Sequence, residues 1–150
     1  MTERVDFYVL NSAAPKQRWA FACRLTEKAY LKKLSVVILN EAMADAQALD
    51  EMLWTFSERS FVPHKVSVDE GSFDPQTPVH LVLESATPPA ADLLVNLTPR
   101  LPSQMQRYSR IAEIVDADEE RRQLGRERFK AYRNLKITLE THQIDETAEP

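Results

Sequence analysis

The chain has 150 residues, of which 43% are hydrophobic and 28% charged, and its formal net charge is −4. This length and composition are typical of one globular domain with a core of its own. Because the protein as a whole is acidic, it does not attract nucleic acid, and any contact with an anionic partner has to come from a local basic patch.

The sequence carries no signal for export or for membrane insertion. Its first residues lack the apolar segment of a secretory signal, and no run approaches the roughly 18–20 apolar residues of a membrane span. The single cysteine, Cys23, excludes an internal disulfide and fits a reducing compartment. We therefore expect a cytoplasmic protein that makes no membrane contact, with Cys23 packed inside a helix.

Strands and helices alternate in the first part of the chain. Residues 5–10 are rich in β-branched and aromatic residues and predict a strand. Residues 34–39 are almost continuously apolar, which is typical of a parallel strand buried on both faces. Helices are predicted over about 15–33 and 43–56 from their helical spacing of apolar residues. This alternation predicts right-handed βαβ units and an α/β fold.

The rest of the chain extends this pattern. Strands are predicted at 65–68, 79–83, 93–97 and 111–115, with a short helix near 102–107 and a basic helix that begins near Asp118. Residues 139–150 are polar, and we expect a flexible tail there, which leaves a domain over residues 1–138. The fold class is α/β, a single domain with a mostly parallel sheet flanked by helices, like a nucleotide-binding fold that lacks the phosphate-binding loop.

No motif in the sequence predicts catalysis. The two glycines, Gly71 and Gly125, cannot build a dinucleotide or Walker-type phosphate loop. The histidines, His64, His80 and His142, are scattered and match no compact metal spacing. We therefore expect no catalytic residue, no cofactor and no metal, and the sequence indicates a binding module.

A basic stripe follows the last predicted helix. Residues at i, i+4, i+7, i+8 and i+11 share one helical face, and here they are Arg122, Arg126, Phe129, Lys130 and Arg133. Basic groups around an aromatic ring suit an acidic ligand that also carries an apolar group. The alternative is a solvated amphipathic helix. On either interpretation, the inward face of the helix could be formed by Leu124, the stem of Arg128, Ala131 and Leu135.

A second candidate surface lies at the end of the helix over 43–56. Large apolar residues surround more of that helix than a single core face needs, and Trp54 points away from the others. Pro63 stiffens the loop that follows and could hold Phe61 and Val62 outward. Large aromatic residues near a rigid loop are typical of an interface core. The alternative is that Trp54 and Phe61 close the core under the loop.

Three segments together resemble a known family. Residues 49–54 (LDEMLW), 60–64 (SFVPH) and 124–133 (LGRERFKAYR) are similar to the chi subunit of bacterial DNA polymerase III holoenzyme. The resemblance spans about residues 5–135. It implies an accessory clamp-loader subunit without enzymatic activity, with an α/β fold that does not use nucleotide. It also implies two partners, the psi subunit of the clamp loader and the acidic C-terminal tail of single-stranded-DNA-binding protein, which ends in an Asp-Ile-Pro-Phe-like sequence.

The resemblance also implies positions for the two binding sites. The psi-facing surface would contain Trp54, Phe61, Val62 and Pro63. The tail site would contain Arg122, Arg126, Phe129 and Lys130, with Arg133 on the same basic face. Phe129 stands where tyrosine is familiar in the family, and Arg122 where lysine is expected, so ring packing and charge are kept while a hydroxyl contact is lost.

Other functions remain open from the sequence alone. The basic helix could bind single-stranded nucleic acid directly, although such binders usually combine a basic groove with several stacking rings, and we expect contact with nucleic acid to be mainly indirect. The surface around Trp54 and Phe61 could dock a helicase or a repair factor in place of psi. A degenerate nucleotide-binding enzyme is disfavoured by the missing phosphate loop.

Overall fold

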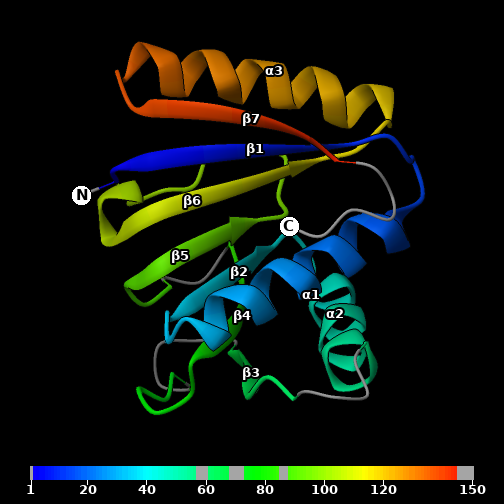
Figure 1. The fold of residues 1–150 in the computed structure, drawn as a ribbon, viewed down its shortest axis with the longest axis vertical. Helices are drawn as coiled ribbons and strands as arrows, with labels where there is room; N and C mark the ends of the chain where they lie inside the picture. The colour runs from blue at the N-terminus through cyan, green and yellow to red at the C-terminus, as the bar shows by residue number, and fades with distance from the viewer. Residues whose placement is uncertain (1, 57–60, 68–72, 85–87, 145–150) are drawn as a thin grey trace.

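Seven parallel strands form one sheet in the computed structural model, which describes residues 2–56, 61–67, 73–84 and 88–144 (Figure 1). The strand order across the sheet is β3-β4-β2-β5-β6-β1-β7. Helices pack on both faces, so the predicted α/β fold with a mostly parallel sheet is confirmed. Because all strands of the described part run in one direction, their carboxyl ends meet at a single edge of the sheet.

The boundaries of the elements are close to those predicted. The strands are β1 (Arg4–Leu10), β2 (Val36–Asn40), β3 (His64–Ser67), β4 (Val79–Leu83), β5 (Ala91–Asn96), β6 (Tyr108–Val115) and β7 (Thr138–Ile144). The helices are α1 (Pro15–Leu31), α2 (Met43–Thr55), the short 3-10 helix η2 (Met105–Arg107) and α3 (Glu119–Asn134). Ser60, Val68, Gly71 and residues 145–150 lie outside the described residues.

The two faces of the sheet bury two separate apolar clusters. Alternation along β1 sends Tyr8 and Leu10 to the face that α1 and α2 cover, and Val5 and Phe7 to the face that α3 covers. β2 is buried along its whole length, as expected for a central parallel strand. The prediction of a buried Cys23 is confirmed, since its side chain is fully enclosed on the inner face of α1 and burial raises the pKa of the thiol to about 12. None of the helices in the described ranges is both long and apolar enough to cross a membrane.

The prediction of a flexible tail from residue 139 is wrong for residues 139–144. These residues belong to β7, which pairs in parallel with β1 along its whole length. The polar sequence of β7 suits an edge strand that stands largely in solvent, and backbone hydrogen bonds to β1 supply the order that apolar content does not. The described domain therefore extends to Ile144.

Candidate functional site

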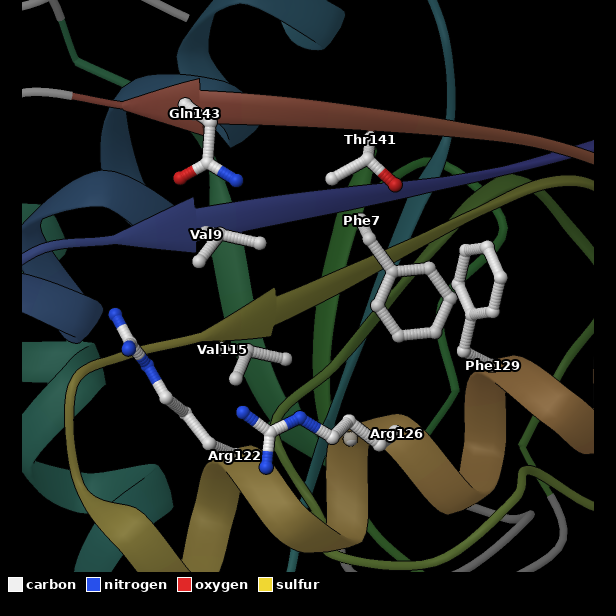
Figure 2. Close-up of a pocket in the computed structure, with 9 residues that line it drawn as sticks. Phe7, Val9, Val115, Arg122, Arg126, Phe129, Thr141 and Gln143 are labelled. Atoms are coloured by element: carbon white, nitrogen blue, oxygen red, sulfur yellow. The ribbon is translucent and has the colours of Figure 1, made fainter.

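A pocket of about 280 Å³ lies between α3 and the edge of the sheet (Figure 2). We call it the α3 pocket. Its floor comes from β1, β6 and β7, and its wall is the face of α3 that carries Gly125 and Phe129. The lining residues are Phe7, Val9, Val115, Arg122, Gly125, Arg126, Phe129, Thr141 and Gln143. Three of the five residues predicted on the basic stripe, Arg122, Arg126 and Phe129, thus line a pocket whose apolar floor comes from distant segments of the chain.

The parallel register of the sheet builds this floor. Phe7 lies beside Thr141 on β7, and Val9 lies between Val115 on β6 and Gln143 on β7. All these positions face α3 because side chains alternate along a strand. The Phe7 and Phe129 rings meet edge-on, with centroids 5.3 Å apart and an interplanar angle of 64°. An apolar slot thus lies at the base of the pocket.

The two arginines of the α3 pocket have different environments. Arg122 is held in place, since its Nε donates a 3.1 Å hydrogen bond to the carbonyl oxygen of Asp116. Arg126 is exposed, and the single hydrogen bond described for its guanidinium is a long 3.5 Å contact with Oε1 of Gln123. In Figure 2 both guanidinium groups lie at the same end of the pocket, away from Phe129. A carboxylate there would find charged N–H donors, and an attached ring would reach the apolar floor.

The other two predicted basic residues stand apart from the pocket. Lys130 and Arg133 are exposed and do not line it. They can contribute long-range attraction to an acidic segment but no contact within the pocket itself.

The predicted inward face of α3 is partly wrong. Its buried residues are Gly125, Arg128 and Tyr132, while Leu135 is 55% exposed.

A buried polar network explains why α3 turns Arg128 inward. Glu113 on β6 is fully enclosed, and its carboxylate accepts hydrogen bonds from Arg128 Nε (3.0 Å), Tyr132 Oη (2.6 Å) and Asn96 Nδ2 (2.9 Å). Complete burial raises the pKa of Glu113, against the opposing effect of Arg128 and the hydrogen bonds. Arg128 also donates to the carbonyl oxygen of Pro99. The network fixes α3 on the sheet, and with it the wall of the α3 pocket.

The start of α3 is fixed by its own capping contacts. The Asp118 side chain accepts a 2.9 Å hydrogen bond from the backbone N–H of Arg121, as its predicted place at the helix start requires. The guanidinium of Arg121 pairs with Asp116, at 2.7 Å from Oδ2. Arg121 is therefore engaged in the helix cap, while its neighbour Arg122 faces the pocket.

The second predicted surface is an exposed pair of stacked rings, which we call the aromatic patch. Trp54 is 59% exposed and Phe61 is 46% exposed, yet their rings stack with centroids 4.7 Å apart. The alternative prediction, that Trp54 and Phe61 close the core under the loop, is therefore wrong. Pro63 is half-buried beside them. The expectation that Val62 points outward is wrong, because Val62 is fully buried in the core on the α1 and α2 side.

Val62 is fully buried although its neighbour Phe61 is exposed. These successive side chains therefore point to opposite sides of the backbone, as they do in extended chain. His64 then lies beside the patch, with ring centroids 5.3 Å from Trp54 and 5.8 Å from Phe61. Its Nε2 lies 3.1 Å from Asp50 on α2. The patch therefore has a supported underside and a free outer face.

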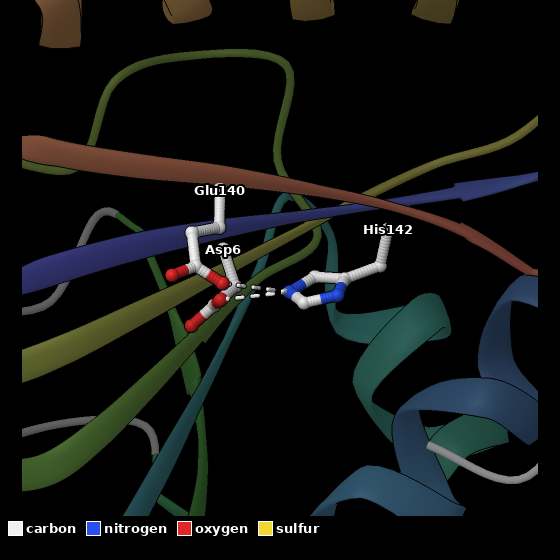
Figure 3. Close-up of side chains that lie close together, drawn as sticks. All are labelled: Asp6, Glu140 and His142. Carbon is white, nitrogen blue, oxygen red and sulfur yellow. Dashed lines mark hydrogen bonds and ion pairs between the residues drawn. The ribbon is translucent and has the colours of Figure 1, made fainter.

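A third cluster joins β7 to β1 on the face opposite α3 (Figure 3). Asp6, Glu140 and His142 bring potential metal ligands within 4.8 Å of one another, which their distance in the sequence concealed. Arg4, however, pairs with both carboxylates, at 2.7 Å from Asp6 and 3.1 Å from Glu140, and Arg110 lies 3.0 Å from Asp6. Because guanidinium groups already supply the positive charge, the cluster is an ion-pair network that fastens β7.

The sequence resembles a family of replication proteins along nearly its whole length. A model of the family described as DNA polymerase III chi subunit, HolC, matches residues 1–140. The DNA polymerase III subunit chi of Pseudomonas aeruginosa is 37% identical over 141 residues, which cover 94% of this chain and 96% of that protein. The chain belongs to the DNA polymerase III chi subunit family. The subunit from Haemophilus influenzae is 28% identical to this chi-family chain, over 96% of it and 99% of the relative.

Solved structures share the fold of this chi-family protein at low sequence identity. T4 UvsW has a TM-score of 0.68 at 8% identity, and S. cerevisiae Dbp5 L327V bound to RNA and ADP BeF3 has a TM-score of 0.62 at 10% identity. The chain spans 42% of the length of each of these proteins. This likeness concerns the fold alone. Family membership makes the chain an accessory subunit of DNA polymerase III in DNA replication.

Proposed function

We propose that this chi-family protein is a non-catalytic adaptor of the replication machinery in the cytoplasm. Its α3 pocket binds the acidic C-terminal tail of single-stranded-DNA-binding protein, and its aromatic patch joins the clamp loader through the psi subunit. The observation that supports tail binding most directly is the combination of two guanidinium groups with an apolar slot in one pocket. Support for the psi contact comes from two large stacked rings that remain half-exposed.

The chemistry of the tail matches the α3 pocket group by group. The terminal carboxylate pairs with Arg126, which has donors to spare, and with Arg122 beside it. The terminal phenylalanine ring packs on Phe7 and Phe129, and the upstream aspartates are attracted by Lys130 and Arg133. Because a disordered peptide must be ordered on binding, we expect a dissociation constant on the order of micromolar. Exposed charges are screened over about 8 Å at physiological ionic strength, so binding weakens as salt rises.

A peptide titration tests the tail site. A labelled peptide that ends in Asp-Ile-Pro-Phe is titrated beside the same peptide without its last residue. We expect saturable binding only of the complete peptide, and a loss of about tenfold or more with Arg126→Ala, which corresponds to about 1.4 kcal/mol. Lys32→Ala removes an exposed charge at the end of α1, outside the pocket, and is the matched control. Equal binding of the two peptides would contradict the assignment.

The same titration separates direct nucleic-acid binding from tail binding. A single-stranded oligonucleotide replaces the peptide, and the two ligands are then mixed. Phe129 is the one aromatic ring that α3 contributes to the pocket. Single-strand binders usually combine several stacking rings along a basic groove, so we expect the oligonucleotide to bind weakly and without dependence on Phe129. Tight oligonucleotide binding that Phe129→Ala abolishes would favour the direct mode.

The psi contact has its own test. Phe61→Asp places a charge in the middle of the aromatic patch, where a partner would have to bury it. Co-purification with the psi subunit should be lost, while the affinity for the tail peptide stays within about twofold, because the patch and the α3 pocket lie on different elements and additivity holds for distant sites. Retained co-purification would remove the patch from the psi interface.

A further inference from the structure

An open apolar groove runs between α1 and α2, beside the aromatic patch. Its volume is about 560 Å³, and its walls are formed by Trp19 of α1 and by Ala48, Met52 and Trp54 of α2. Lys16 and Glu51 stand among these residues as its charged members. We call this feature the α1/α2 groove. It lies on the face of the sheet opposite the α3 pocket.

The groove and the aromatic patch share one residue. Trp54 lines the groove and at the same time stacks on Phe61. Trp19 and Met52 are half-buried against the core, so each still offers part of its side chain to the groove. An apolar strip therefore extends from Trp19 through Met52 and Trp54 to Phe61. A partner that covers only Phe61 and Trp54 would leave the first half of this strip in water.

The charge on α2 indicates the character of the occupant. The helix carries Asp45, Asp50 and Glu51 and has no lysine or arginine. Within the groove, Lys16 of α1 and Glu51 of α2 give the rim one charge of each sign, which is complementary to apolar side chains flanked by a basic residue beside Glu51 and an acidic residue beside Lys16. The basic α3, by contrast, lies on the other face of the sheet.

The walls of the groove also favour a helical occupant. Both walls are helices, and away from their end turns the backbone groups are paired within each helix, so the walls offer mainly side chains to an occupant. An extended peptide would bury unpaired N–H and C=O groups there, whereas a helix satisfies its own. A helix laid in a groove between two helices is also a common mode of recognition.

We propose that the α1/α2 groove receives an amphipathic helix of the psi subunit, with its apolar side chains between Trp19 and Met52 and its lysines or arginines beside Glu51. The proposal rests on the psi contact proposed above and extends it to α1. It predicts that a single partner helix covers both tryptophans of the chain.

The two tryptophans make the proposal directly testable, because the chain has no others. Trp54→Phe leaves Trp19 as the reporter, and Trp19→Phe leaves Trp54. On addition of psi, we expect the emission of both reporters to shift to shorter wavelength, with the same dissociation constant. A shift of Trp54 alone would overturn the groove proposal and leave the psi contact standing. If the unaltered protein shows no binding to psi, the psi contact itself fails, and the groove proposal fails with it.

Two matched pairs of variants test the groove and its charge. Ala48→Arg fills the groove, whereas Gln47→Arg adds the same group at an exposed neighbouring position that does not line it. We expect about tenfold or greater loss of psi affinity for the first and less than about twofold for the second. Glu51→Lys should weaken binding more than Glu51→Gln, and high salt should reduce the difference. Equal effects within either pair would overturn the corresponding part of the proposal.

Discussion

Gly125 of α3 lies directly against Val115 of β6. A Cβ atom at Gly125 would stand 2.9 Å from one methyl carbon of Val115 and 3.4 Å from the other. Glycine inside a helix costs about 1 kcal/mol relative to alanine, so its presence here needs a reason. The close approach of α3 to β6 supplies that reason. Because both residues line the α3 pocket, this contact sets the distance between the pocket wall and its floor.

Gly125→Ala should therefore fail to stabilise the protein. The gain in helix propensity, about 1 kcal/mol, is opposed by overpacking against a stiff β-branched side chain, which costs about 1–3 kcal/mol. We expect an unchanged or lower free energy of unfolding in urea, and a weaker affinity for the tail peptide as α3 moves away from the floor.

A second substitution separates crowding from other causes. Val115→Ala removes the methyl groups that a Cβ at residue 125 would meet. In this background, Gly125→Ala should raise the free energy of unfolding, in line with the propensity of alanine. If Gly125→Ala instead stabilises the unaltered protein by about 1 kcal/mol and leaves tail affinity unchanged, the contact does not set the pocket.

The pair of Glu113 and Arg128 should be the most sensitive point of α3. Removing one partner of a buried ion pair leaves the other charge unpaired and typically costs about 3–5 kcal/mol. Arg128→Met should fall in this range because Glu113 is fully buried. Although Arg128 does not line the α3 pocket, tail affinity should fall as well, since the helix loses its anchor. Urea denaturation and peptide titration measure the two effects.

A double variant distinguishes the unpaired charge from lost packing. In Glu113→Leu/Arg128→Met, neither charge remains, so most of the stability lost in Arg128→Met should return. Tyr132→Phe removes one hydrogen bond to Glu113 and should cost about 1–3 kcal/mol, less than the loss of Arg128. A double variant as unstable as Arg128→Met would show that packing, and not the charge, dominates.

Local patterns were enough to predict most of the fold. β1, β2 and β4 carry dense apolar sequence, and their common direction in a parallel sheet follows from the helices between them. β7 was missed because only Leu139 and Ile144 are apolar in it, and its order comes from pairing with β1, far away in the sequence. The local propensity and periodicity of residues 138–144 give no information about their pairing with β1.

The candidate site was predicted to the extent that it lies on one helix. Arg122, Arg126 and Phe129 follow from helical spacing, and all three line the α3 pocket. Phe7 and Gln143 could not be found in this way, because sheet register brings them to α3. Alternation along the strand would have placed Phe7 and Val9 on one face, but not beneath α3.

Cys23 should be inert in the folded protein. Its side chain is fully buried, and burial raises the pKa of the thiol to about 12, so hardly any reactive thiolate exists near pH 8. We expect no alkylation by iodoacetamide over the hours in which a model thiol reacts, and prompt reaction after urea unfolding. Rapid modification of the native protein would mean that α1 opens readily.

The ionised carboxylate of Asp6 on β1 helps to hold the edge strand β7 in place through its contact with His142. This carboxylate is almost fully buried and accepts hydrogen bonds from Arg4, His142 and Arg110. Burial by itself raises the pKa of Asp6, but the three donors outweigh it and hold the pKa below its ordinary value. The resulting stabilisation is present above the unfolded pKa of about 3.9 and is lost as the pH falls through the folded pKa.

Asp6→Asn should therefore lower the free energy of unfolding by about 1–3 kcal/mol at pH 7, and the difference from the parent protein should shrink below about pH 4. Glu140→Gln, whose carboxylate is half-exposed, should cost less than about 1 kcal/mol. Because Asp6 ties β7 to β1, the amide hydrogens of residues 138–144 should exchange faster in Asp6→Asn, while those of β5 do not. A stability difference that stays constant from pH 7 to pH 3 would contradict this role, since it would owe nothing to the charge of Asp6.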